Sequence, residues 1–306
     1  MPNYVRDFIF VLLPLLVLLG VLPFFYRNEL LLFNFTIYFA LAQGLNVIYG
    51  FTGYLPFGYV GFFGVGAYGF ALAIIHLTTS PALALAIAGL AALVLGVILI
   101  PLLRLSGAYF AIANLAAAQA VYHIVSNPDL QDITKGPYGV SLANVFAPRL
   151  SYYSALAITA LASVVVIWFR NSRFGLALQA IRDDSLSAAM AGIPVVRQRT
   201  IAWLLSALIA GLTGGVFAWH ISVFYPETAF DISISIFALV FALFGGATTL
   251  LGPVIGVLLL YGLYNLIGIT IPQYFQLIYG ILIVVLVLFL PQGIVSLVSR
   301  RGIRVP

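Results

Sequence analysis

Long apolar runs follow one another along almost the whole chain, and they constrain the fold more than any other feature. A helix rises about 1.5 Å per residue, so roughly 20 mainly apolar residues are needed to cross a bilayer. Runs of about this length, separated by short polar segments, lie at 8–25, 30–49, 55–76, 81–103, 107–125, 151–169, 200–220, 232–250, 253–271 and 274–290. We therefore predict an all-α polytopic membrane protein with about ten transmembrane helices, within a range of roughly 8–10.

The residue composition supports this fold class and excludes several kinds of function. Hydrophobic residues make up 63% of the chain and charged residues 7%, against roughly 45–50% and ~25% in soluble domains. The sequence has no cysteine, which excludes disulfides, thiolate nucleophiles and cysteine metal sites. The net charge is +5, but the arginines gather in loops and near the chain ends, where positive charge orients membrane proteins. We expect one transmembrane domain over residues 1–306 in a lipid bilayer, and no nucleic-acid binding.

Three groups of arginines predict how the chain is oriented in the membrane. Five of the twelve arginines lie between Arg170 and Arg199, one is Arg6, and three more are in the C-terminal tail. The positive-inside rule places all three groups in the cytoplasm. Six apolar runs precede the 170–199 segment and four follow it, so both termini return to the cytoplasmic side. The segment 126–150 is then the longest extracytoplasmic loop.

The placement of the charged residues also limits the chemistry of transport. Each acidic residue lies in a loop or near the end of an apolar run. Proton- and sodium-coupled carriers usually need an ionisable group or a broken-helix ion site in mid-membrane, so ion coupling is disfavoured. The single lysine, Lys135, is not part of a GxxxxGK[ST] phosphate loop, and there is no HExxH motif. We expect no catalytic residue, metal site or cofactor on this chain; ATP and magnesium would be bound by another polypeptide.

The segment 170–199 has the pattern of a helix that docks onto a partner. From Phe174 to Met190 it is rich in helix formers, and apolar residues recur every three to five positions beside charged ones. Gly192 and Pro194 then supply a stop signal. Small residues in this helix would let another backbone approach closely. A helix at the membrane interface, or a solvated linker, is the alternative interpretation.

A glycine-rich stretch leads into the third apolar run, with glycines at positions 50, 53, 58, 61, 64, 66 and 69. In a membrane helix such spacing lets neighbouring backbones pack closely. Interruption by glycine and proline can also mark an unwound backbone that lines a substrate path. Both interpretations stay open, and we predict a re-entrant or broken helix near 50–66.

Uncharged polar residues inside the apolar runs are the candidates for a translocation path. Amides and hydroxyls suit the transient passage of zwitterions or small neutral solutes, because tight charge pairing would trap the cargo. The competing interpretation is hydrogen bonding between helices, worth about 1 kcal/mol per contact. With three residues of the glycine-rich stretch, the candidates are Gln43, Asn46, Gly53, Tyr54, Gly58, Asn114, Gln119, Tyr122 and His123.

Four sequence blocks occur in an order that is found in a known family. They are LNVIYGFTGYLPFG at 45–58, RFGLALQAIRDD at 173–184, FGGATTLLGPVIG at 244–256 and LPQGI at 290–294. Together they span most of the chain. In these blocks the sequence resembles the branched-chain amino acid ABC transporter permeases of the LivM type.

This resemblance implies one permease of an importer in the plasma (inner) membrane of a prokaryote. The implied partners are a second permease of the same family, two cytoplasmic ATP-binding subunits and an extracytoplasmic substrate-binding protein. The implied cargo is a branched-chain or related hydrophobic amino acid; an importer of urea, short amides or a sugar, or an ATP-independent channel, is the alternative. Residues 170–199 would form the ATPase-coupling loop, and Gly246, Gly252 and Pro253 a structural turn. The implied coupling residues are Arg173, Phe174, Gly175, Ala180, Arg182, Asp183, Asp184, Ala188, Ala189 and Gly192.

Overall fold

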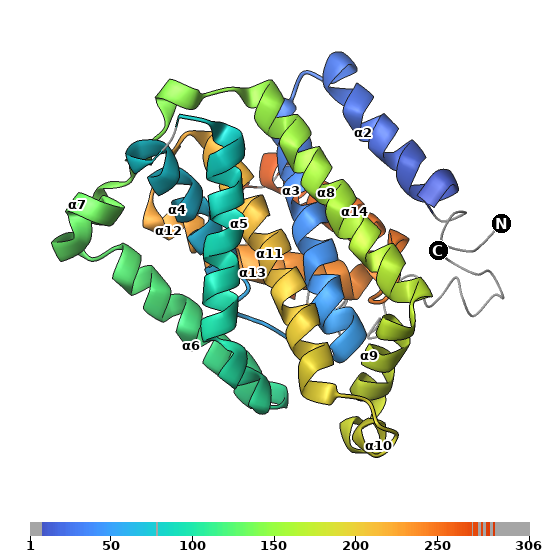
Figure 1. The fold of residues 1–306 in the computed structure, drawn as a ribbon. Coiled ribbons are helices and arrows are strands. Elements are labelled where there is room, and N and C mark those ends of the chain that lie inside the picture. The colour runs from blue at the N-terminus through green and yellow to red at the C-terminus, as the bar shows by residue number, and fades with distance from the viewer. Residues whose placement is uncertain are drawn as a thin grey trace.

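The computed structural model describes residues 8–77, 79–270, 272–274, 277, 280–281 and 284. Over these residues the chain folds into a bundle of helices with a single two-stranded sheet (Figure 1). Most of the predicted tenth run, 274–290, lies outside the described residues, as do Arg6, the arginines of the C-terminal tail and the LPQGI block.

Seven helical segments of the described chain are long and apolar enough to cross a membrane, and two shorter apolar helices accompany them. This confirms the prediction of an all-helical membrane protein, while the side of the membrane that each end faces stays a prediction. In chain order the main helices are α2 (Leu13–Phe25), α3 (Glu29–Leu45), α4 (Val60–His76), α5 (Pro81–Ile98), α6 (Gly107–Val125), α8 (Pro148–Asn171), α11 (Val195–Ile221), α13 (Ile232–Gly245) and α14 (Leu251–Thr270).

Shorter elements connect the main helices. A π-helical turn, η1 (Phe8–Leu12), precedes α2, and a second one, η2 (Asn46–Gly50), extends α3. Between α6 and α8 lie η4 (Pro128–Leu130), α7 (Gln131–Thr134), η5 (Gly136–Tyr138), β1 (Val140–Ser141) and η6 (Ala143–Val145). The others are η3 (Ile100–Arg104), α9 (Arg173–Asp183), α10 (Ser185–Met190), β2 (Val223–Phe224), α12 (Pro226–Ala229) and η7 (Pro272–Tyr274).

The two predicted loops lie at opposite ends of the bundle, because α8 runs from one to the other (Figure 1). We call the end that carries α9 and α10 the α9 end. The opposite end is the β end, where β1 pairs antiparallel with β2 just after α11. Leu12 of η1 packs against Ile167, near the last turn of α8, and against Leu250. The turn η1 therefore lies at the α9 end. This is the end expected if six crossings separate η1 from α9, because an even number of crossings returns the chain to the same side.

Helices α4, α5 and α11 pack most closely and form the centre of the bundle. Glycines make this possible: a Cβ at Gly66 would overlap the carbonyl oxygen of Gly211, and one at Gly214 would overlap that of Phe63. Trp203 of α11 is buried, and its Nε1 donates to the carbonyl of Gly96 in α5 at 2.9 Å. Of the two interpretations of the glycine-rich stretch, close packing of backbones therefore applies to Gly66, which lies at the centre of the bundle.

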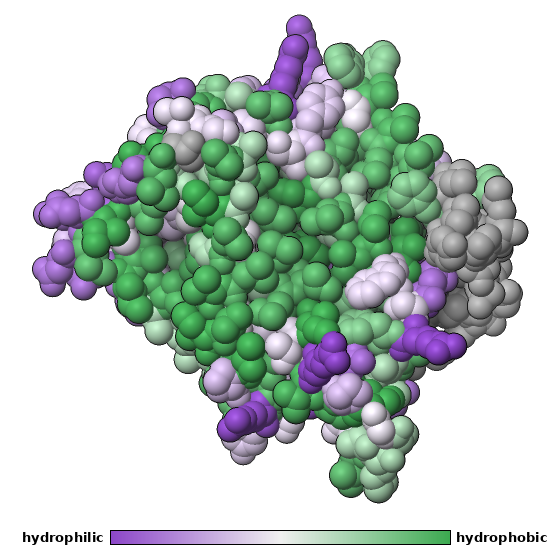
Figure 2. Space-filling view, viewed as in Figure 1, coloured by the Kyte–Doolittle hydropathy of each residue, from purple (hydrophilic) through white to green (hydrophobic). Residues whose placement is uncertain are grey.

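The surface of the bundle is mostly apolar. Figure 2 shows one continuous apolar face, with hydrophilic residues collected mainly at its margins. Helices α5 and α6 contribute exposed residues such as Leu83, Leu90 and Ile112, and only 28% of each span is buried within the chain. A surface of this kind is suited to lipid tails or to another membrane subunit, since either removes it from water.

Candidate translocation and coupling site

Residues 53–59 interrupt the helical backbone between η2 and α4. Gly53 has a φ of 75°, a left-handed conformation that favours glycine. Two side chains from other helices accept hydrogen bonds at the start of α4: Asn114 Oδ1 from the Gly58 N–H at 2.8 Å, and Ser235 Oγ from the Val60 N–H at 2.7 Å. Unpaired backbone donors are costly inside a membrane, so these contacts stabilise a helix that begins within the bundle. The apolar run predicted at 55–76 is therefore helical only from Val60.

Asn114 reaches this interruption from α6. Its side chain is completely buried, and its Nδ2 has no hydrogen-bond partner among the described residues. A buried donor without an acceptor costs roughly 1–3 kcal/mol, so it favours any acceptor that comes within reach. Asn114 thus holds a free amide donor beside the nonhelical backbone.

Gly58 leaves no room for a side chain at this point. A Cβ at this position would overlap the backbone carbonyl of Asn114, which α6 fixes in place. We expect Gly58→Ala to push α6 away from α4 and to lower uptake about tenfold, which corresponds to roughly 1.4 kcal/mol, within the usual range for overpacking. Uptake into proteoliposomes measures this. Gly262→Ala is the matched control, because nothing lies within 4 Å of a Cβ there; equal uptake by both variants would contradict the expectation.

Gln43 and Asn46, both fully buried, bind the connection between α13 and α14. Gln43 Nε2 donates to the carbonyl of Leu250 at 2.7 Å. Asn46 Nδ2 donates to the carbonyl of Thr249 at 2.9 Å, and its Oδ1 accepts from the Thr248 N–H at 2.7 Å. In this structure both amides therefore hydrogen-bond the backbone between two helices, and their place on a translocation path stays a prediction.

The connection itself is a tight turn that begins at Gly246 and packs against Gly252 and Pro253 in the first turn of α14. Gly246 has a φ of 117°, and a Cβ at Gly252 would overlap the Gly246 carbonyl oxygen. Thr249 Oγ1 donates to that same carbonyl at 2.8 Å and accepts from the Gly252 N–H at 3.0 Å. The turn presents the carbonyls that Gln43 and Asn46 bind.

The remaining path candidates lie elsewhere on α6. Gln119 and Tyr122 are half-buried and His123 is exposed, towards the β end of that helix. The Tyr122 ring lies 6.1 Å from the ring of Phe230, between centroids. The structure therefore divides the predicted path residues into a buried group around the interruption and a separate group on the outer part of α6.

The predicted coupling segment, residues 170–199, contains the two helices α9 and α10, so the prediction of a single helix from Phe174 to Met190 is wrong. Asp184 is extended, with φ −154° and ψ 109°, and so ends α9 and begins α10. Its carboxylate accepts from the Leu186 N–H at 2.9 Å and from the Ser187 Oγ at 2.6 Å. Aspartate is favoured at an N-cap and disfavoured in the interior of a helix. Asp184 therefore separates two helices, although helix formers continue on both sides of it.

The coupling segment packs one face on the bundle and leaves another exposed. Gly175, Leu178, Ile181 and Ala188 are buried, and Phe174 stacks on Trp168 at 5.4 Å between ring centroids. Arg173, Asp183, Asp184, Ala189 and Gly192 are exposed, and Ala180 is half-buried. The exposed apolar residues of the segment and of the start of α11 are Leu176, Leu186, Met190 and Val196.

Arg182 joins the coupling segment to the interrupted backbone. Its Nη1 donates to the carbonyl of Gly50 at 2.6 Å, at the end of η2, and its Cγ lies 3.3 Å from the position that a Cβ on Gly53 would take. Beside this contact, Arg199 lies over the ring of Tyr54 at 4.8 Å. A cavity of about 710 Å³ opens here between residues 49–57, the start of α6 and residues 181–185. The arrangement places the predicted coupling loop directly against the predicted path.

Several residues of this site were not singled out from the sequence. They include Ser235, Thr248 and Arg199, which contact positions far away in the chain. Such contacts leave no local pattern in the sequence, so they are visible only in the folded bundle.

The N-cap at Asp184 leads to a prediction with a defined pH range. The Ser187 hydroxyl, followed by the backbone N–H groups of Leu186 and Ser187, holds the pKa of the Asp184 carboxyl below its ordinary value. A carboxylate with a lowered pKa stabilises the fold above its unfolded pKa of about 4 and loses that effect as the pH falls below it. We expect the protection factors of the α10 amides, which are corrected for the slower intrinsic exchange in acid, to fall severalfold below that pH. At neutral pH, Asp184→Ala should exchange faster severalfold and Asp184→Asn should not; equal exchange in both variants would contradict this.

An apolar helical bundle that contains an interrupted helix is suited to a multi-pass membrane permease. The family model described as branched-chain amino acid transport system / permease component matches residues 29–287. The chain therefore belongs to this family; it is the permease component of an ABC transporter and not an enzyme. This confirms the predicted family and the predicted multi-pass inner-membrane permease.

Individual relatives agree with this assignment. The chain is 30% identical over 293 residues to the high-affinity branched-chain amino acid transport system permease protein LivM of Escherichia coli (strain K12), covering 85% of this chain and 68% of the relative. The LivM protein of Salmonella typhimurium is 29% identical with the same coverage. The L-arabinose ABC transporter permease protein AraH of Azospirillum brasilense is 27% identical over a match that covers 39% of this chain and 37% of the relative. No solved structure matches the chain.

Proposed function

We propose that this permease carries branched-chain amino acids, or closely related hydrophobic amino acids, into the cell. The observation that carries the proposal is the match over 85% of the chain to two permeases named for branched-chain amino acids. The free Nδ2 of Asn114 beside the interrupted backbone supports it, because an amide donor suits a carboxylate oxygen without binding it tightly.

A sugar is the second candidate cargo. The relative named as an L-arabinose permease matches 39% of the chain, so part of this fold also occurs in a protein named for a sugar. Neutral amides and hydroxyls would suit a sugar as well as a zwitterion. The two cargoes are distinguished by measurement of uptake rather than by the fold.

We place the coupling of ATP hydrolysis at α9 and α10. The exposed apolar side chains Leu176, Leu186 and Met190 offer a surface for a cytoplasmic ATP-binding subunit. Movement of α9 would be transmitted by Arg182 to Gly50, and from there to residues 53–59. Closure of the ATP-binding subunits would then shift the permease between its inward-open and outward-open states.

The complex that this proposal requires has four kinds of chain. A second permease of the same family would cover part of the apolar surface, two ATP-binding subunits would contact the α9 end, and a substrate-binding protein would contact the β end. In this orientation the α9 end and both termini face the cytoplasm, as the arginines predict. ATP and magnesium would be bound by the partner subunits.

The test is uptake by the whole complex in proteoliposomes. The permease, its genomic-neighbour permease, the ATP-binding subunits and the binding protein are reconstituted, and labelled leucine uptake is measured with valine, urea or ribose as competitor. We expect ATP-dependent uptake that valine alone blocks. A block by ribose would change the cargo to a sugar, and uptake independent of ATP would contradict the coupling proposal and favour a channel.

A further inference from the structure

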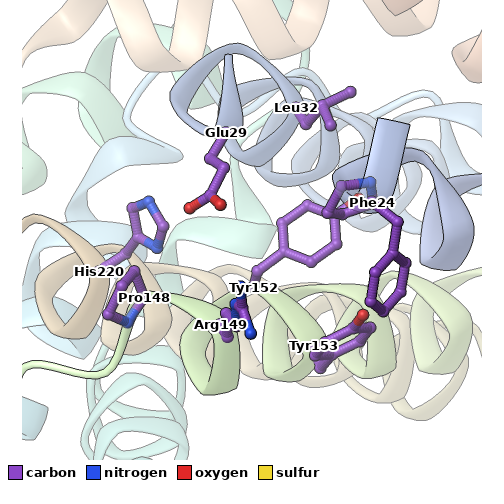
Figure 3. A pocket seen from close by; sticks show the side chains of 9 residues that line it. Phe24, Glu29, Leu32, Pro148, Arg149, Tyr152, Tyr153 and His220 are labelled. Carbon is purple, nitrogen blue, oxygen red and sulfur yellow. The ribbon is translucent and has the colours of Figure 1, made fainter. Parts of the chain in front are cut away.

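A small cavity at the β end lies apart from the interrupted helix. It has a volume of about 200 Å³ and lies between the ends of α2 and α11 and the starts of α3 and α8 (Figure 3). Pockets for drug-sized ligands measure about 300–1,000 Å³, so this cavity suits a smaller solute. Its lining combines apolar rings with two side chains of opposite charge, Glu29 and Arg149.

The apolar part of the lining is fixed by a proline in α2. Pro23 has no N–H, so it leaves the carbonyl of Leu19 without its helical donor, and the hydroxyl of Tyr152 donates to that carbonyl at 2.7 Å. The hydroxyl of Tyr153 donates to the next carbonyl, that of Gly20, at 3.3 Å. Both hydroxyls are therefore engaged with α2, and the tyrosine rings remain to line the cavity beside Phe24 and Leu32.

The charged part of the lining is open to a ligand. Glu29 stands at the first turn of α3 and Arg149 at the first turn of α8. Both side chains are exposed, and among the described residues neither charged group makes a hydrogen bond or an ion pair. The Glu29 carboxylate is directed into the space between α3 and α8 in Figure 3. One anionic and one cationic group therefore face one small space from separate helices.

His220 completes the polar side of the cavity in a fixed orientation. Its Nδ1 lies 2.8 Å from Ser151 Oγ, and its ring stacks on Phe33 with 3.6 Å between centroids. These contacts leave only the Nε2 edge of the ring for a ligand. The ring is therefore held in place, whereas the exposed side chains of Glu29 and Arg149 would be ordered when a ligand binds.

We propose that this cavity binds a free α-amino acid with an apolar side chain. The Glu29 carboxylate would bind the ligand's ammonium group, the Arg149 guanidinium would bind its carboxylate, and Phe24 and Leu32 would contact its side chain. Two charges of opposite sign that line one cavity match a zwitterion, and a sugar or urea carries neither. The proposal rests on the proposed amino-acid cargo and adds a site for it at the β end, before the interrupted helix is reached.

A zwitterionic phospholipid headgroup carries the same pair of charges, so the test must separate the two ligands. Binding of labelled leucine to the whole transporter complex, without its binding protein, is measured in nanodiscs made with phosphatidylethanolamine or with phosphatidylglycerol only. We expect saturable leucine binding in both lipids. No leucine binding in either lipid, or leucine binding only where phosphatidylethanolamine is absent, would overturn the proposal; the latter would assign the cavity to the headgroup.

The variants are Glu29→Gln, Arg149→Gln and Leu32→Trp, the last of which fills the apolar side and keeps both charges. We expect each to weaken leucine binding about tenfold or more, the scale of a lost charge pair or a blocked pocket. The control is Arg27→Gln, an exposed arginine of the same α2–α3 connection that does not line the cavity. Binding by the three variants equal to that of the control would overturn the site.

Failure of this site can be told apart from failure of the proposed function. If the unmodified complex takes up leucine in an ATP-dependent way while all variants bind leucine normally, only the cavity assignment falls. If the unmodified complex takes up ribose and not leucine, the proposed amino-acid cargo is contradicted, and the reason to propose an amino-acid site in the cavity is lost as well.

Discussion

Replacing Gly66 with alanine is expected to destabilise the bundle by about 3 kcal/mol or more, one of the largest effects of a single methyl group in this chain. Gly66 lies in α4, where a Cβ would overlap the carbonyl oxygen of Gly211 in α11. These helices, together with α5, pack more closely than any other group in the described bundle. Neither backbone can move away without disturbing the third helix, so relaxation is limited.

The measurement is thermal unfolding of the purified chain in detergent, followed by size-exclusion chromatography of the heated samples. Gly214→Ala is expected to behave like Gly66→Ala, because a Cβ there would overlap the carbonyl oxygen of Phe63. The matched control is Gly262→Ala in α14, where nothing lies within 4 Å of the added atom. Melting temperatures that agree among the three variants would show that the α4–α11 crossing is looser than described.

The apolar runs predicted most of the helices because length and hydropathy are local properties. The predicted run 107–125 coincides with α6. The predicted run 232–250 is longer than α13, because the apolar residues after Gly245 form the turn that precedes α14. The predicted run 55–76 begins before the helix does, since hydropathy does not distinguish the nonhelical stretch 53–59 from the helix that follows. What the sequence did indicate there was the unusual density of glycine.

The glycine-rich stretch illustrates why one pattern left two interpretations open. Gly53 and Gly58 lie in the nonhelical backbone, whereas Gly61 and Gly66 lie in α4 against neighbouring helices. Both physical reasons for glycine occur within about fifteen residues, so no periodicity could separate them. Likewise, the amide of Asn46 was recognisable as a buried polar group, but its acceptor at Thr249 is 203 positions away.

The coupling segment was located from its arginines and helix formers, but the role of Arg182 could not be read from the sequence. The pattern placed it on the polar side of a helix, for contact with a partner. In the structure its guanidinium donates to the carbonyl of Gly50, 132 positions earlier. It therefore bridges two parts of this chain, and its predicted contact with an ATP-binding subunit stays a prediction.

Arg182→Ala is expected to lower ATP-driven uptake about tenfold while the ATP-binding subunits still copurify with the permease. A hydrogen bond from a charged donor contributes about 1.5–3 kcal/mol, and its loss would free Gly50 and residues 53–59 from the movement of α9. ATP hydrolysis by the complex should continue, because the exposed apolar surface of Leu176, Leu186 and Met190 is unchanged. The ratio of leucine transported to ATP hydrolysed measures this uncoupling directly.

Arg173→Ala is the matched control, since Arg173 is an exposed arginine of the first turn of the same helix. If exposed charges of α9 contribute to docking, this variant reduces copurification of the ATP-binding subunits and leaves the ratio of transport to hydrolysis unchanged. Arg182→Lys separates charge from geometry, because an ammonium group keeps the charge but has a shorter reach and lacks the planar fork of a guanidinium. If Arg182→Ala loses the ATP-binding subunits and Arg173→Ala does not, Arg182 serves in docking, and the contact with Gly50 is not what couples the two sites.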